Sequence, residues 1–154
     1  MIGYTKNAIS KKSPMLEHVT VDGRELAIIL RAGYRNEGIH FFTPNDFSQQ
    51  LAYMNRPRGY KITPHVHNPV ERQVQYTKEV LFIKSGKVRV DFYRDDQSYT
   101  ESRILEQGDV ILLAYGGHGF VMLDDAEIIE VKQGPYAGEA DKTRFDGIDD
   151  KDVK

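Results

Sequence analysis

The stretch GYKITPHVHNPVERQVQYTKEVLFIKSG, residues 59–86, decides how this chain is interpreted. It carries two histidines, His65 and His67, that are separated by one residue. Residues two apart on a β-strand point to the same face, so we expect both imidazoles on one side of a strand. The stretch ends in the apolar run EVLFIK, residues 79–84, which has the β-branched and aromatic content of a second strand.

Short apolar runs separated by turn residues continue on both sides of this stretch. Upstream, two extended runs within residues 16–30 meet at Asp22-Gly23, a strong signal for a β-hairpin. Downstream, residues 79–93 predict a hairpin that turns at Ser85-Gly86, and residues 119–132 predict another across Asp124-Asp125. Further strands are expected at residues 38–42, 98–105 and 110–114. This pattern predicts an all-β fold, either a barrel or a double-sheet jelly roll.

Length and composition indicate one globular domain over residues 1–154, with a polar N-terminal arm at about 1–16 and a flexible polar tail at about 138–154. The net charge of −2, without a basic stripe, argues against a nucleic-acid partner. The absence of cysteine leaves any metal to nitrogen and oxygen ligands. No run is long enough for a membrane-spanning helix and no signal peptide is evident, so we expect a cytoplasmic protein without a membrane partner.

Two motifs resemble those of the cupin superfamily. The first is Gly59, the His65/His67 pair, Glu79 and Gly86, and the second is GDVILLAYGGHGF at residues 108–120. The resemblance implies a cupin-type double-stranded β-helix, which is a jelly-roll barrel. It also implies one divalent transition metal, held by His65, His67, Glu79 and His118. Imidazole and carboxylate ligands suit manganese, iron, nickel, copper and zinc. The alternative is a cupin that has lost its metal and keeps these side chains in its interior.

This sequence departs from the cupin pattern in the spacer of 11 residues between His67 and Glu79, which is longer than usual. Glu71 stands at the shorter spacing and is therefore an alternative carboxylate ligand. Glu79 is preferred because Leu81 and Ile83 share its strand face and should point into the barrel. The second motif also has Ala114 in place of its usual proline, a shorter turn before His118, and no asparagine after it.

The residues before Glu79 are candidates for the mouth of a substrate pocket. If residues 73–79 form one continuous strand, Gln75 and Thr77 face inward with Glu79. Glu71 and Tyr76 are the candidates for a catalytic base. Four basic side chains are solvated charges or, alternatively, contacts to an anionic substrate: Arg72, Lys78, Lys142 and Arg144. His18 and His40 are expected to be structural or exposed.

The resemblance to short single-domain cupins linked to nucleotide-sugar and surface-polysaccharide metabolism implies a function. We expect a metal-dependent enzyme of isomerase, epimerase or lyase type that acts on a small polar metabolite such as a sugar derivative. One alternative is an iron-dependent dioxygenase, and another is a non-catalytic module that binds a small molecule. Cupins often pair through sheet edges, so a homodimer is expected, with the N-terminal hairpin available to cover an edge strand.

Overall fold

The N-terminal hairpin is present as the sequence predicts. Strand β1 (Leu16–Val21) pairs antiparallel with β2 (Arg24–Leu30) across a two-residue turn. Asp22 and Gly23 have φ angles of 51° and 76°, and two successive positive φ angles are what a type I′ hairpin turn requires. The structure is a computed structural model that describes residues 14–154, so most of the predicted N-terminal arm lies outside the described residues.

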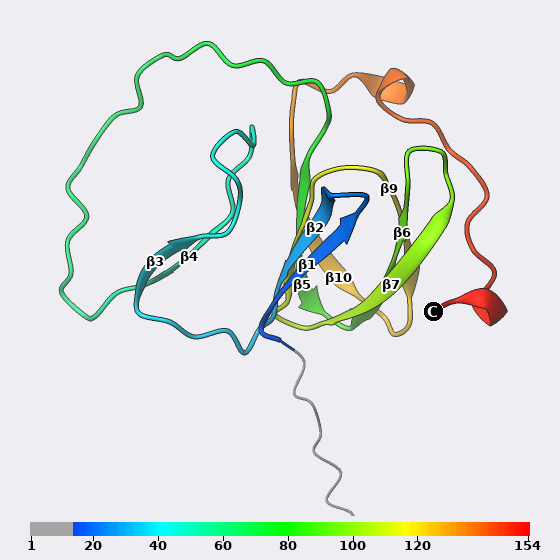
Figure 1. Ribbon diagram of the computed structural model, residues 1–154. Coiled ribbons are helices and arrows are strands. Elements are labelled where there is room, and N and C mark those ends of the chain that lie inside the picture. Colours follow the sequence, from blue (N-terminus) through cyan, green and yellow to red (C-terminus); the bar gives the residue numbers. More distant parts are fainter. Residues whose placement is uncertain (1–13) are drawn as a thin grey trace, which may run out of the picture.

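The described part of the chain is all-β, which confirms the predicted class, and it contains no α-helix between residues 14 and 154 (Figure 1). Two short 3₁₀ turns, η1 (Gly138–Asp141) and η2 (Asp150–Asp152), lie in the C-terminal segment. None of the helices within residues 14–154 could span a bilayer. The strands after β2 are β3 (Gly38–Phe41), β4 (Ala52–Asn55), β5 (Glu79–Ser85), β6 (Lys87–Tyr93), β7 (Tyr99–Glu106), β8 (Val110–Leu113), β9 (Gly117–Met122) and β10 (Glu127–Lys132).

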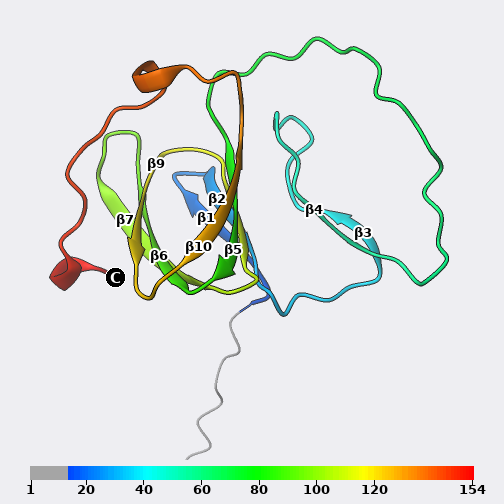
Figure 2. The ribbon, with the colours of Figure 1, turned by 180° about the vertical axis from the view of Figure 1, so that it is seen from behind.

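Two of the three sheets face each other as a sandwich, and neither closes into a barrel (Figures 1 and 2). One has five strands in the order β1-β2-β8-β5-β10 and the other has three in the order β7-β6-β9. From β5 onward the chain passes back and forth between them. Inward-facing side chains of both sheets form one buried core: Val19, Leu26, Ala27, Ile29, Leu81, Ile83, Val88, Val90, Phe92, Leu105, Ile111 and Leu113.

Two predicted hairpins are wrong in their pairing, although their strands are present. β5 pairs with β8 and β10, whereas β6 pairs with β7 and β9. β10 likewise joins β5 and not β9. Each of these short turns therefore carries the chain from one sheet to the other. At Gly86 (φ 82°) a Cβ would lie only 2.2 Å from the carbonyl oxygen of Asp125, so the two crossings also pack against each other.

An ionic network fixes one end of the sandwich, which we call the closed end. Arg31, which follows β2, contacts Glu17 Oε1 at 2.6 Å and Asp109 Oδ2 at 2.8 Å. It also donates to the carbonyl of Ile104 on β7, at 2.8 Å, and so links the two sheets. Burial opposes the charge on Arg31, but its bonds to the two carboxylates outweigh burial and raise its pKa. Asp109 is 5% exposed and accepts further bonds from backbone amides.

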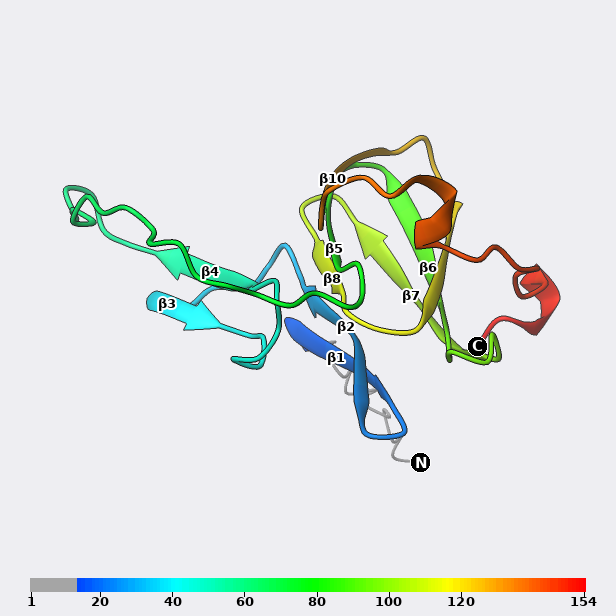
Figure 3. The ribbon, with the colours of Figure 1, turned by 90° about the horizontal axis from the view of Figure 1, so that it is seen from above.

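Residues 56–78 form an arm that runs outside the sandwich, between β4 and β5 (Figure 3). The base of the arm is the β3–β4 hairpin and the neighbouring residues, whose Phe42, Phe47 and Leu51 pack on the outer face of the five-stranded sheet. The arm itself contains no strand. The predicted strand that carries the histidine pair is therefore wrong, and so is the continuous strand over residues 73–79. Pro57, Pro64 and Pro69 interrupt this segment, and proline removes a donor from any ladder.

The C-terminal segment follows the three-stranded sheet to its end (Figure 1). The amide of Ile148 donates to the hydroxyl of Tyr93 at 2.9 Å, and the amide of Lys154 donates to the hydroxyl of Tyr99 at the same distance. Asp150 forms an ion pair with Arg89 at 2.9 Å. The tail thus has defined contacts, whereas its predicted flexibility stays a prediction.

Candidate functional site

A cavity of about 640 Å³ opens at the end of the sandwich opposite the closed end. It lies at the N-terminal end of β5, where the strand begins with Glu79, and four separate segments of the chain form its walls. Its volume is in the range of small-molecule sites. The lining residues are Tyr76, Thr77, Glu79, Tyr93, Arg94, Asp95, Gln97, Leu113, Ala114, Tyr115, Gly116, Gly117, His118, Gly119, Asp141, Lys142, Thr143, Arg144, Phe145 and Gly147.

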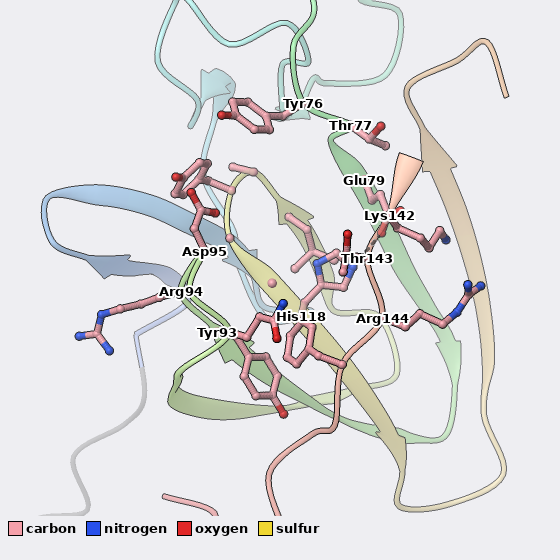
Figure 4. Close-up of a pocket in the computed structure, with 18 of the residues that line it drawn as sticks. Tyr76, Thr77, Glu79, Tyr93, Arg94, Asp95, His118, Lys142, Thr143 and Arg144 are labelled. Atoms are coloured by element: carbon pink, nitrogen blue, oxygen red, sulfur yellow. Dashed lines mark ion pairs between the residues drawn. The ribbon is translucent and has the colours of Figure 1, made fainter. Parts of the chain in front are cut away.

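Glu79 and His118 meet in this cavity from opposite sheets (Figure 4). Glu79 is the first residue of β5, on the face that carries the buried Leu81 and Ile83, as the sequence predicts. His118 is on β9, and its cross-strand partner is the core residue Phe92 on β6. The imidazole Nε2 lies 3.1 Å from Glu79 Oε2. The alternation of side chains along β5 and β9 thus points the Glu79 carboxylate and the His118 imidazole into the same cavity.

The surroundings favour an ionised Glu79. The hydrogen bond from His118 lowers the pKa of Glu79, and partial burial opposes this effect without cancelling it. The positive charges of Lys132 and Lys142 lower the pKa further. The side chain of Glu79 is 14% exposed and that of His118 is 28% exposed. The cavity therefore holds a carboxylate that is available as an anionic ligand or as a base at neutral pH.

Aromatic rings form the apolar part of the cavity wall. Tyr76 and Tyr115 make an edge-to-face pair with centroids 5.6 Å apart, and Tyr93 and Phe145 make another at 5.0 Å. The guanidinium of Arg24 lies 3.2 Å from the centre of the Tyr115 ring, a distance typical of a cation–π contact. Tyrosine rings with hydroxyl groups suit a ligand that has both apolar faces and polar edges.

The C-terminal segment supplies one whole wall of the cavity, and sequence reasoning largely missed it. Thr77 Oγ1 donates to Asp141 Oδ1 at 2.6 Å and ties this wall to the end of the arm. Lys142 and Arg144 line the cavity, where they could contact an anionic substrate. Arg144 also pairs with Glu139. The isolated Phe145 in a polar tail was the available signal, because a lone aromatic there needs a packing partner.

The structure does not bring His65 and His67 to the other two predicted ligands. Both are exposed on the arm, where their rings contact each other with centroids 5.2 Å apart. His65 Nδ1 lies 2.9 Å from the carbonyl oxygen of Thr63, a local contact. Within residues 14–154, no three His, Asp or Glu side chains lie close enough together to hold a metal. Of the four predicted metal ligands, Glu79 and His118 line the cavity, and His65 and His67 do not.

The remaining candidates divide clearly between the cavity and elsewhere. Thr77 and Tyr76 line the cavity, whereas Arg72, Gln75 and Glu71 do not and are exposed. Because β5 begins at Glu79, the residues before it do not alternate as a strand would. His18 pairs with Glu25 at 3.0 Å on the exposed surface, and His40 contacts the carbonyl of Glu37, so both lie outside the cavity, in line with the expectation that they are structural or exposed.

Comparisons with known proteins leave the family open. No family model matches the chain, and no solved structure matches it. The chain is similar to the protein translocase subunit SecA of Sulfurimonas denitrificans, with 22% identity over 140 residues. It is also similar to SecA of Renibacterium salmoninarum, with 24% identity over 144 residues. These alignments cover 83% and 82% of this chain but only 15% and 14% of the two translocase subunits.

Proposed function

We propose that this protein is a metal-dependent enzyme of the cupin type that acts on a small polar metabolite, such as a sugar derivative, in the cavity around Glu79 and His118. The observation that carries the proposal is the pairing of this carboxylate and this imidazole, at 3.1 Å, from two facing sheets. The chain crosses between the two sheets four times from β5 to β10, with only β6 and β7 consecutive in one sheet, and these crossings support a jelly-roll arrangement.

The donor chemistry of the pair fits a divalent transition metal. An ionised carboxylate and a neutral imidazole are the ligand types that manganese, iron, nickel, copper and zinc accept, and Glu79 is held in its ionised form. His65 and His67, on the arm, would complete the ligand set. Such a metal would supply Lewis acidity toward the oxygens of a bound substrate.

The rest of the cavity suits a polar ligand of limited size. Lys142 provides a positive charge beside Glu79, and the paired rings of Tyr76 and Tyr115 provide a surface for a sugar or a base ring. Proton movement next to a carbonyl, as in isomerisation, epimerisation or elimination, needs a base within reach of the substrate. Tyr76 lines the cavity and keeps its candidacy for that role, whereas Glu71 lies outside it.

Solvent-exchange measurements test this proposal directly. The metal-loaded protein is incubated in D₂O with a panel of nucleotide sugars, and proton NMR follows the replacement of carbon-bound hydrogens. We expect metal-dependent exchange with at least one class of sugar, abolished in Glu79→Gln and His118→Ala and retained in the control His40→Ala, which lies outside the cavity.

The same panel separates the alternatives. Oxygen consumption with an iron-loaded sample would support a dioxygenase. Thermal stabilisation by a sugar without exchange or oxygen uptake would support a binding module. The absence of metal binding, of exchange and of stabilisation would overturn the proposal.

A further inference from the structure

The arm, residues 56–78, is an unusual feature for a domain of this size. Connections longer than about 12–15 residues without secondary structure are uncommon in compact domains and are usually functional. Three views show the arm running away from the sandwich (Figures 1, 2 and 3). A segment of this length that extends away from its own domain is therefore expected to have a function.

Hydrogen bonding does not hold the central part of the arm to its own domain. Within residues 14–154, every hydrogen bond made by residues 57–75 stays within the arm. The amide of Tyr60 bonds to Pro57, His65 bonds to Thr63 and Arg72 bonds to Val70. The first hydrogen bond from the arm to another part of the domain is at Thr77, which bonds to Asp141 in the C-terminal segment. Backbone donors and acceptors along the arm are thus available to a partner.

The arm also exposes apolar side chains that a solvated loop would not need. Val66 is 85% exposed and Val70 is 62% exposed, and they share the arm with Tyr60, Ile62 and Val74. Several exposed apolar side chains on one segment are typical of an interaction site. The side chains flank the histidine pair, so whatever covers them also approaches His65 and His67.

A matching surface lies on the sandwich beside the cavity. β10 is an edge strand of the five-stranded sheet, with no further strand paired to it among the described residues. On the outer face next to this edge, Phe82, Ile129 and Val131 are 39%, 52% and 58% exposed. β10 ends at Lys132, which is the cross-strand partner of Glu79. A strand-like segment added at this edge would therefore end near the site.

We infer that the arm belongs to a second copy's site: in a symmetric dimer, each arm crosses to the β10 edge of the other protomer and delivers His65 and His67 to its Glu79 and His118. A two-fold dimer uses the same pair of surfaces twice, which covers both arms and both edges. Each protomer would contribute its arm, residues 56–78, which is close to the roughly 20–30 residues that each side of a stable interface contains. This inference rests on the proposed metal site and names the partner that completes it.

Mixed dimers test the inference. One variant carries His65→Ala and His67→Ala, and the other carries Glu79→Gln and His118→Ala. The two chains are co-expressed with different affinity tags, mixed dimers are isolated through both tags, and metal content is measured by mass spectrometry. A site shared between protomers predicts about one metal per mixed dimer, although each variant alone binds none. A site built within one chain predicts no metal in the mixture.

The reciprocal mixture gives the opposite expectation and serves as a matched control. When a wild-type chain is paired with a chain that carries all four substitutions, a shared site predicts no metal and a site within one chain predicts about one. Failure to capture wild-type dimers through two tags would also overturn the inference. If the wild-type protein binds no metal at all, the proposed function fails instead, so the two failures are distinguishable.

Discussion

Asp109 offers the sharpest test of how the closed end of the sandwich is held. Its carboxylate accepts three hydrogen bonds: from the amide of Ala32 at 2.8 Å, from the amide of Glu106 at 3.0 Å, and from Arg31 at 2.8 Å. In Asp109→Asn, one of the two oxygens becomes an NH₂ group. That group faces a donor in either orientation of the amide, so at least one buried N–H loses its acceptor.

The size of the effect follows from these contacts. Breaking a buried charge pair by removing one partner typically costs about 3–5 kcal/mol. Arg31 keeps Glu17 and the carbonyl of Ile104, so the lower end of this range applies. We expect Asp109→Asn to lower the free energy of unfolding by about 3 kcal/mol. With a urea m-value of about 1–3 kcal/mol/M, the unfolding midpoint should fall by about 1–3 M.

Urea unfolding followed by circular dichroism at pH 7 measures this shift. Asp124→Asn is the matched control, because Asp124 is exposed and its side chain makes no hydrogen bond among the described residues. Its unfolding free energy should change by less than about 0.5 kcal/mol. If Asp109→Asn falls within the range of this control, the network does not hold the two sheets together and the reasoning is refuted.

Three further predictions follow from particular contacts. Gly86→Ala should lower the free energy of unfolding, measured in urea, by at least about 2 kcal/mol, because residue 86 has a positive φ and no space for a Cβ. Gly59→Ala is the control: residue 59 also has a positive φ but has open space around it, so the loss should be no more than about 1–2 kcal/mol. In metal-free protein, the lowered pKa of Glu79 contributes stability that is present above the unfolded-state pKa and is lost as pH falls through the folded-state pKa. The stability difference between wild type and Glu79→Gln should therefore shrink from pH 7 to pH 3, and a constant difference would contradict the His118–Glu79 bond. Tyr93→Phe removes the acceptor for the amide of Ile148, so hydrogen exchange at residues 145–154 should accelerate while exchange in β5 does not change.

Much of the fold could be predicted from the sequence because strand signals are local. The Asp22-Gly23 turn specifies its own geometry, and alternation in β5 places Glu79 on the core side with Leu81 and Ile83. Pairing between sheets is not local. The turn at Gly86 looks the same in sequence whether the two strands pair with each other or enter different sheets, and only the contact with Asp125 distinguishes these cases.

The site was predictable in part for the same reason. Glu79 and His118 each follow a strand pattern, so both reach the cavity. His65 and His67 follow a motif whose strand the chain does not form, since prolines punctuate the arm. Most of the wall formed by residues 141–147 was missed, because its position depends on Tyr93 and Phe145 meeting across more than fifty residues of chain.

Metal stoichiometry tests the central claim most directly. Purified protein is stripped, reloaded with manganese, iron, nickel, copper or zinc, desalted and measured by inductively coupled plasma mass spectrometry, beside the double variant Glu79→Gln with His118→Ala. The account predicts about one metal per chain for the wild type with at least one of these ions, and close to none for the variant. A wild-type protein that retains no metal, or a variant that retains as much as the wild type, would contradict it.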